Sequence, residues 1–198
     1  MIDASLIKEL REKTGAGIID CKNAIVKANG DLNKAVDLLR IKGAGIAEKK
    51  AGRTTSEGII GSYIHHDEKI GVMIEVNCET DFVARNEEFK GFVKDLAMQI
   101  AGANPPPVYV KTEDIPPEVI EKEKEIYSAQ ARESGKPEAV IQKIAEGKIE
   151  KFYSERCLLE QPFIKNPDFK IKDLLVQRIS KVGENISVRR FIRFKVGE

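Results

Sequence analysis

The sequence is poor in the residues that most metal sites and many enzymes use. Its 198 residues include two histidines, His65 and His66, and three cysteines, Cys21, Cys78 and Cys157. The cysteines are far apart and form no CxxC pair, so neither a disulfide framework nor a zinc site is indicated. Three scattered thiols are typical of a protein from a reducing compartment. We therefore expect a cytoplasmic protein that holds no metal and no other cofactor.

Long apolar runs and a net charge are missing as well. No stretch approaches the ~18 apolar residues of a membrane span, and the N-terminus has no apolar signal core. The 33 Lys and Arg residues are balanced by 32 Asp and Glu residues, so the whole chain has no field that attracts nucleic acid or an anionic membrane. Basic residues outnumber acidic ones only in residues 1–53 and 118–198. We predict no membrane contact and no direct nucleic-acid contact, although the basic ends could touch RNA or an acidic protein.

The motifs of nucleotide binding and catalysis are also absent. There is no Walker loop, and Gly15-x-Gly17 lacks the third glycine and the preceding strand of a dinucleotide site. His65 and His66 are adjacent on a predicted strand, so we expect their side chains to point to opposite faces, where they could not share a metal. No Ser-His-Asp or Cys-His arrangement can be justified. An enzyme that uses carboxylates alone stays open, but no pair of them stands out.

Apolar residues recur at helical spacing in three stretches of the first 50 residues. Residues 14–17 (Thr-Gly-Ala-Gly) end the first stretch, Asn29-Gly30 closes the second, and Asp31 is a natural N-cap for the third. This spacing resembles the three-helix ubiquitin-associated (UBA) fold. We predict a small UBA-like domain at residues 1–50 and a polar linker at 51–56. The stripes expected to face inward are Leu6, Ile7 and Leu10; Ile18, Ile19, Ala24, Ile25 and Ala28; and Leu32, Ala35, Val36, Leu38 and Leu39.

Beyond the linker the apolar period changes to two. Residues 70–78 alternate between apolar and other side chains, which predicts a half-buried strand with a hairpin partner at 58–65. Asn86 is expected to cap a helix that ends near Gly102. Strands and helices are mixed without βαβ regularity, so residues 57–198 are predicted to form a core of the α+β class, an antiparallel sheet packed with helices. Its other elements are charged helices at 117–134 and 137–156 with a break at 135–137, a loop through Pro162 and Pro167, a helix at 172–182 and a closing strand at 185–196.

Two segments of this core allow more than one interpretation. We predict a polar loop, Thr80-Asp81-Phe82-Val83, between the strand and the capped helix. Phe82 is a large aromatic in this loop, and it could fold back as a lid on its own core or face a partner. Residues 189–194 interleave arginines with aromatics, as single-strand nucleic-acid platforms do. They also fit a terminal strand whose edge is kept soluble by arginine. We favour the second interpretation, because one basic strand in a neutral protein makes a weak polyanion site.

Three motifs, in order along essentially the whole chain, resemble those of the elongation factor Ts family. They are Lys8–Gly17 followed by Asp20-Cys21-Lys22, Asn77–Arg85, and Val182–Phe191. The resemblance implies a guanine-nucleotide exchange factor without a chemical active site. Such a factor binds elongation factor Tu in its GDP and nucleotide-free forms, promotes GDP release by displacing Mg²⁺, and lets GTP bind during translation elongation.

The resemblance also implies which residues contact elongation factor Tu. The family's Mg²⁺-displacing segment falls on Thr80, Asp81, Phe82 and Val83. A second contact, from the N-terminal domain, falls on the segment that contains Thr14, Gly15, Gly17, Asp20 and Cys21.

The chain is shorter than some members of that family. Longer members carry two related α/β units and an inserted helical pair, whereas this chain has room for one unit. We therefore predict a homodimer through the core domain, in which alternate apolar residues of the closing strand take part: Ile186, Val188, Ile192 and Phe194. The alternatives are a ribosome- or RNA-associated protein that uses the basic ends, and a ubiquitin-type adaptor that rests on the helical domain alone.

Overall fold

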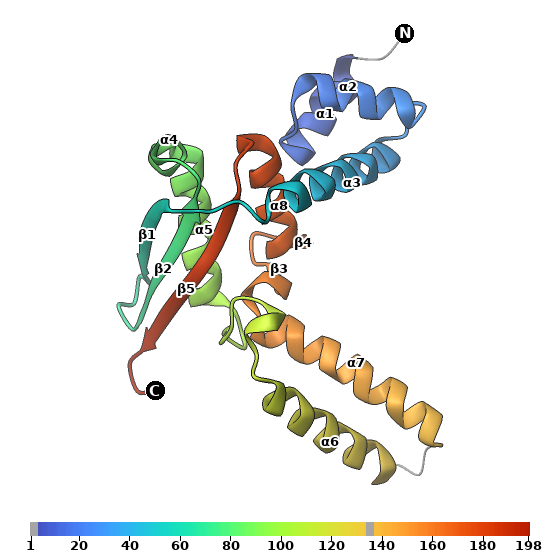
Figure 1. Cartoon of the computed structure of the whole chain (residues 1–198), viewed down its shortest axis with the longest axis vertical. Coiled ribbons are helices and arrows are strands. Elements are labelled where there is room, and N and C mark those ends of the chain that lie inside the picture. The colour runs from blue at the N-terminus through green and yellow to red at the C-terminus, as the bar shows by residue number, and fades with distance from the viewer. Residues whose placement is uncertain (1–3, 134–136) are drawn as a thin grey trace. The chain divides into compact units, whose positions relative to one another are not determined.

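A computed structural model describes residues 4–133 and 137–198 (Figure 1). It confirms the α+β class: helices pack with a three-stranded antiparallel sheet in the order β1-β2-β5. Contacts divide the chain into two compact units built from segments distant in sequence. The first unit comprises residues 1–61, 75–94 and 172–189, and the second comprises 62–74, 95–171 and 190–198. The division into domains at 1–50 and 57–198 stays a prediction.

The three N-terminal helices are α1 (Ala4–Thr14), α2 (Ile18–Lys27) and α3 (Leu32–Lys50), as predicted. Asp31 caps α3, because its Oδ1 accepts a hydrogen bond of 3.1 Å from the backbone N–H of Lys34. The turn before it holds Gly30 at a φ of +85°, a conformation that favours glycine. The buried side chains that join the helices are Leu10, Cys21, Ala24, Ile25, Ala28 and Ala35.

The predicted inward stripe of α2 is wrong at its first two residues. Ile18 and Ile19 are 57% and 73% exposed. Ile18 is the first residue of the helix, one turn ahead of the first buried residue, Cys21. Ile19 lies seven residues before Val26, which is also exposed, so these two share the outer face.

The sheet consists of β1 (Glu57–Ile64), β2 (Ile70–Cys78) and β5 (Ile186–Lys195). Along β2, alternate residues from Val72 to Cys78 are buried, whereas Met73 on the other face is half exposed. The strand predicted at 70–78 is therefore confirmed at both ends. Helix α5 (Glu87–Gly102) follows, and Asn86 caps it as expected: its Oδ1 accepts a 2.8 Å hydrogen bond from the N–H of Glu88.

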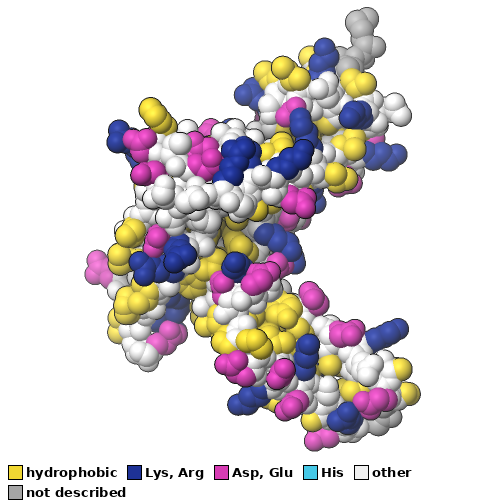
Figure 2. Space-filling view, viewed as in Figure 1, with side chains coloured by type: hydrophobic (Ala, Val, Ile, Leu, Met, Phe, Trp, Pro, Cys, Tyr) yellow, Lys and Arg dark blue, Asp and Glu magenta, His cyan; other side chains and the backbone are white. Residues whose placement is uncertain are grey.

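The face of the sheet opposite these buried residues carries exposed apolar side chains. In the second unit these are Ile64, Met73, Ile192 and Phe194, which are 48% to 64% exposed. Figure 2 shows hydrophobic side chains gathered over the strands. β5 is an edge strand of the sheet. We call these four residues the apolar sheet face.

The second unit also contains two long charged helices, α6 (Pro117–Glu133) and α7 (Glu138–Arg156), which lie side by side (Figure 1). They confirm the predicted helical pair, although most of the predicted break at 135–137 lies outside the described residues. Ala131 and Ala145 are among the buried residues of this pair, and such small side chains allow close approach of two helices. Short 3₁₀ turns, Thr112–Asp114 and Leu158–Glu160, precede α6 and follow α7.

The segment after α7 was predicted as a loop, and this is wrong. β3 (Pro162–Phe163) and β4 (Asn166–Lys170) pair antiparallel in a small separate sheet. The buried amide of Gln99 holds this segment: its Nε2 donates to Gln161 Oε1 at 3.1 Å, and its Oε1 accepts from the N–H of Ile164 at 2.8 Å. Local sequence pattern carries no sign of this long-range anchor.

Candidate partner-binding site

A single helical turn, α4 (Asp81–Arg85), carries the motif that follows β2. Thr80 occupies the N-cap position in extended backbone, and Asp81 lies in the first turn, where the positive end of the helix dipole favours a carboxylate. Asp81 and Arg85 form an i,i+4 ion pair with an N–O distance of 3.0 Å. The segment predicted as a loop is therefore a short helix.

The side chain of Phe82 projects outward from this turn. It is 81% exposed, whereas its neighbours Val83 and Ala84 are 8% and 6% exposed and face the interior. The interpretation of Phe82 as a lid on its own core is therefore wrong. Burying such a ring in a partner would contribute roughly 1.5–3 kcal/mol to association.

The residue before α4 is anchored from two sides. The carboxylate of Glu184 accepts hydrogen bonds from the backbone N–H of Thr80 at 3.0 Å and from its hydroxyl at 2.7 Å. The thiol of Cys78 donates to the carbonyl of Thr80 over 3.2 Å. Burial, followed by the nearby charge of Glu184, raises the pKa of Cys78 to about 11, so the thiol keeps the proton that it donates.

Glu79 ties the linker to the same region. Its Oε1 accepts a 2.6 Å hydrogen bond from the N–H of Asn185, and its Oε2 lies 3.4 Å from Nη1 of Arg53. The side-chain amide of Asn185 donates to the carbonyls of Arg53 at 2.9 Å and Ala51 at 3.4 Å. The hydrogen bond from Asn185, and then the charge of Arg53, lower the pKa of Glu79 below the 4.5 of an ordinary glutamate.

We expect Glu79→Gln to reduce the acid sensitivity of folding. A carboxylate whose pKa is lower in the folded state contributes stability that is full above its unfolded pKa and is lost as the pH falls through its folded pKa. The variant should therefore have a lower free energy of unfolding at about pH 7 and approach the wild type as the pH falls below 4.5.

Urea unfolding followed by circular dichroism over this pH range measures the difference. Glu146→Gln, which changes an exposed glutamate of α7, is the matched control and should give a curve parallel to the wild type. A Glu79→Gln curve that is also parallel would contradict the assigned role of Glu79.

The predicted N-terminal segment has its own local geometry. The hydroxyl of Thr14 donates to the carbonyl of Leu10 at 2.7 Å, and Gly15, at a φ of +66°, donates its N–H to the carbonyl of Arg11. Both contacts finish α1. Gly17 is the N-cap of α2, and the carboxylate of Asp20 accepts from Lys42 at 2.5 Å.

The segment has a buried part, Cys21, and an exposed part, Ile18 and Ile19. Cys21 is fully buried, and burial raises the pKa of its thiol, so it supports the segment from inside. Ile18 and Ile19 form the exposed part, and the sequence interpretation missed them as surface residues. A usable signal was present for Ile19, since residues seven apart share a helix face and Val26 lies outside the predicted inward stripe.

Comparisons with known proteins cover the whole chain. The family model described as "Elongation factor TS" matches residues 44–198. The chain is 59% identical over 198 residues to elongation factor Ts of Carboxydothermus hydrogenoformans, covering 100% of this chain and 90% of that protein. It is 62% identical over 197 residues to elongation factor Ts of Thermodesulfovibrio yellowstonii, covering 100% and 97%. It is 60% identical over 198 residues to elongation factor Ts of Caldanaerobacter subterraneus subsp. tengcongensis, and the match covers 100% of this chain and 98% of that protein.

The chain belongs to the elongation factor Ts family. Membership implies a role as nucleotide exchange factor for elongation factor Tu in translation elongation. Two of the motifs that carried the resemblance meet in the structure, because Thr80 of the second bonds to Glu184 of the third.

The two histidines are arranged differently from the expectation. Neither lies in a strand: β1 ends at Ile64, and His66 begins the turn to β2. Their rings are consequently close, with centroids 4.2 Å apart in an edge-on arrangement. Within residues 4–133 and 137–198, no group of three or more His, Cys, Asp or Glu side chains is placed to hold a metal ion. Over the same residues, no helix combines the length and apolar character needed to cross a membrane.

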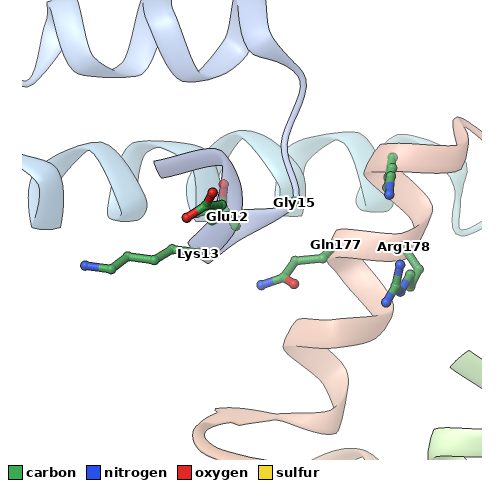
Figure 3. Close-up of a pocket in the computed structure, with 7 residues that line it drawn as sticks. Glu12, Lys13, Gly15, Gln177 and Arg178 are labelled. Atoms are coloured by element: carbon green, nitrogen blue, oxygen red, sulfur yellow. The ribbon is translucent and has the colours of Figure 1, made fainter. Parts of the chain in front are cut away.

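Figure 3 shows a polar depression in the first unit, where Gln177 of α8 (Ile171–Val182) points toward the end of α1. Its cations are already paired with carboxylates of the same chain. The amine of Lys13 lies 2.9 Å from Glu9, and that of Lys181 lies 2.7 Å from Glu88. The depression therefore lacks the unneutralised charge of an anion site. The residues that line it are Glu12, Lys13, Thr14, Gly15, Gln177, Arg178 and Lys181.

Proposed function

We propose that this chain is a cytoplasmic exchange factor that binds elongation factor Tu in its GDP form and promotes GDP release by displacing the Mg²⁺ ion of the partner. GTP then binds to the nucleotide-free complex. The observation that carries this proposal is an 81% exposed aromatic, Phe82, on an anchored helical turn in a member of the elongation factor Ts family. Thr80 precedes that turn as its N-cap, Asp81 begins it, and Val83 packs it against the interior.

The sensitivity of magnesium coordination supports this mechanism. Mg²⁺ requires near-ideal octahedral geometry, with oxygen ligands at about 2.0–2.1 Å. A small shift of the partner segment that holds the ion is therefore costly, and loss of the ion leaves the phosphate charge poorly neutralised. Insertion of Phe82 into elongation factor Tu would cause such a shift.

We assign a second contact to the start of α2. Ile18 and Ile19 are exposed there, beside the surface carboxylate of Asp20. Thr14, Gly15 and Gly17 shape the chain around them, and Cys21 supports them from the core. Two separate contacts on one partner raise the effective concentration of each.

The direct experiment mixes the chain with elongation factor Tu that carries fluorescent GDP and excess unlabelled nucleotide. The release rate should rise with the concentration of the chain and then saturate. With the Mg²⁺ removed by a chelator, the acceleration should become much smaller, because the step that the chain promotes has already occurred. Unchanged release would overturn the proposed function, and equal acceleration without Mg²⁺ would overturn the magnesium mechanism.

We further propose that the working form is a homodimer joined through the apolar sheet face. Ile64, Met73, Ile192 and Phe194 leave apolar area exposed there, and such a patch marks an association surface. Gly71 places no side chain on this face, and a Cβ at its position would lie 3.1 Å from Cδ1 of Ile64. A two-fold contact of this face with itself supplies the second unit that longer family members carry on one chain.

The dimer should dissociate in Ile192→Glu, because a carboxylate would be buried without a partner at the interface. Light scattering at micromolar concentration should give about twice 22.1 kDa for the wild type and 22.1 kDa for the variant. Ile126→Glu, at an exposed isoleucine of α6, is the control and should keep the wild-type mass. A wild-type mass of 22.1 kDa that does not change with concentration would rule the dimer out.

A further inference from the structure

We propose that Glu184 is a positioning residue for Phe82: its carboxylate fixes the start of α4 and thereby the direction in which the ring projects. This inference rests on the proposed function, in which Phe82 enters elongation factor Tu. Glu184 is 104 positions from Thr80 in the sequence. It belongs to the turn between α8 and β5.

The first support is that α4 depends on an anchor outside itself. It has five residues, and an isolated helix of this length is not stable in water. In an ordinary N-cap the threonine hydroxyl accepts a hydrogen bond from the first turn of its own helix. Here the hydroxyl of Thr80 donates to Glu184 instead, at 2.7 Å. The start of α4 is thus held by the turn that carries Glu184.

The second support is that two bonds join the same pair of residues. Oε2 of Glu184 accepts from the backbone N–H of Thr80 at 3.0 Å, and Oε1 accepts from its hydroxyl. Two contacts to one carboxylate fix both the position and the rotation of Thr80, whereas one contact would leave it free to pivot. The ring of Phe82 is only two residues further along.

The third support is that the turn carrying Glu184 is itself held. The amine of Lys50 donates to the carbonyl of Gly183, and the N–H of Asn185 donates to Glu79 at 2.6 Å. Asn185 is 7% exposed. Gly183 has a φ of +79°, which favours glycine and defines the shape of the turn. A fixed turn can transmit its position to α4.

Fluorescence tests the inference in the free protein. The sequence has no tryptophan, so the indole of a Phe82→Trp variant is the only one present. Its exposed position tolerates the larger ring. Adding Glu184→Ala should increase the amplitude of fast local motion in the anisotropy decay by about twofold or more. Glu88→Ala is the matched control, because Glu88 is also a glutamate of the first unit but its ion pair is with Lys181 of α8. This variant should leave the anisotropy decay unchanged. An unchanged decay in the Glu184→Ala variant would overturn the inference.

Exchange kinetics separate positioning from general destabilisation. Glu184→Ala should lower the maximal rate of GDP release about tenfold, with a change below about threefold in the half-saturating concentration. Glu184→Gln, which keeps one carbonyl acceptor, should recover part of the rate. In a Phe82→Ala background, Glu184→Ala should have no further effect, because there is no ring left to position.

The outcomes distinguish this inference from the proposed function. If Phe82→Ala slows release and Glu184→Ala does not, Glu184 is not a positioning residue and the exchange role of Phe82 stands. If Glu184→Ala slows release equally with and without Phe82, its effect is independent of the ring and the inference fails. If neither variant changes the release rate, the proposed role of Phe82 fails as well.

Discussion

Phe82→Ala is expected to lower the rate at which the chain releases GDP from elongation factor Tu by about 10- to 100-fold. Truncation removes the 1.5–3 kcal/mol or so that burial of a phenylalanine ring provides, and each 1.4 kcal/mol or so corresponds to a factor of ten. The free energy of unfolding of the chain should change by no more than about 0.5 kcal/mol, because the ring is 81% exposed. Stopped-flow release of fluorescent GDP and urea unfolding measure the two quantities.

Two further variants sharpen this comparison. Phe82→Leu keeps much of the apolar volume and should retain an intermediate release rate. Val108→Ala truncates a different exposed apolar residue, 55% exposed, and should leave the release rate unchanged. A wild-type release rate for Phe82→Ala would overturn the insertion mechanism. A large loss of stability would show that the ring packs on its own protein.

Phe82 cannot account for a large acceleration by itself. A 10⁴-fold change in an equilibrium requires about 5.5 kcal/mol, well above the contribution of one buried ring. The remaining free energy must come from other contacts with elongation factor Tu, and the exposed Ile18 and Ile19 are our candidates for them. Linkage also requires reciprocity: the factor by which this chain weakens nucleotide binding is the factor by which nucleotide weakens binding of the chain. This reciprocity explains how GTP releases an exchange factor.

The elements with a strong local signal could be predicted from the sequence. Residues 70–78 alternate without interruption, so their strand was located at both ends. Asp31 and Asn86 are cap residues, and both accept the hydrogen bonds expected of them. Asn29-Gly30 closes α2 because both residues adopt positive φ angles, which asparagine and glycine tolerate best.

The candidate site was predictable only in part, because long-range contacts hold it. The motif around Phe82 was found, but its helical turn was missed, since five residues carry no measurable period. Its anchor, Glu184, lies 104 positions away, beyond any local pattern. The closing strand was predicted to within one residue at each end, and Ile192 and Phe194 are exposed as a dimer contact requires. The expectation that Ile186 lies on the same open face is wrong, because Ile186 is only 2% exposed.

Gly58→Ala is expected to reduce the free energy of unfolding by about 3 kcal/mol or more, the largest effect on stability that we predict. Gly58 lies in β1 with a φ of +152°, which side chains rarely adopt. A Cβ there would lie 2.3 Å from the carbonyl oxygen of Val76 and 2.7 Å from Cα of Asn77. Both are backbone atoms of β2, so the clash can be relieved only if the strands separate. Because β2 leads directly into Thr80 and α4, such a separation should also lower the rate of GDP release.

A glycine in open surroundings provides the control for this prediction. Gly91 lies in α5, and a Cβ added there would have no neighbour within 4 Å among the described residues. Gly91→Ala should raise the free energy of unfolding by about 0.5–1 kcal/mol, because alanine is the better helix former. Urea unfolding at one fixed protein concentration, so that any dimer contributes equally, compares the two variants. If Gly58→Ala reduced the free energy of unfolding by less than about 1 kcal/mol, the backbones of β1 and β2 would be able to move apart at Gly58. The strain assigned to a Cβ at this position would then be wrong.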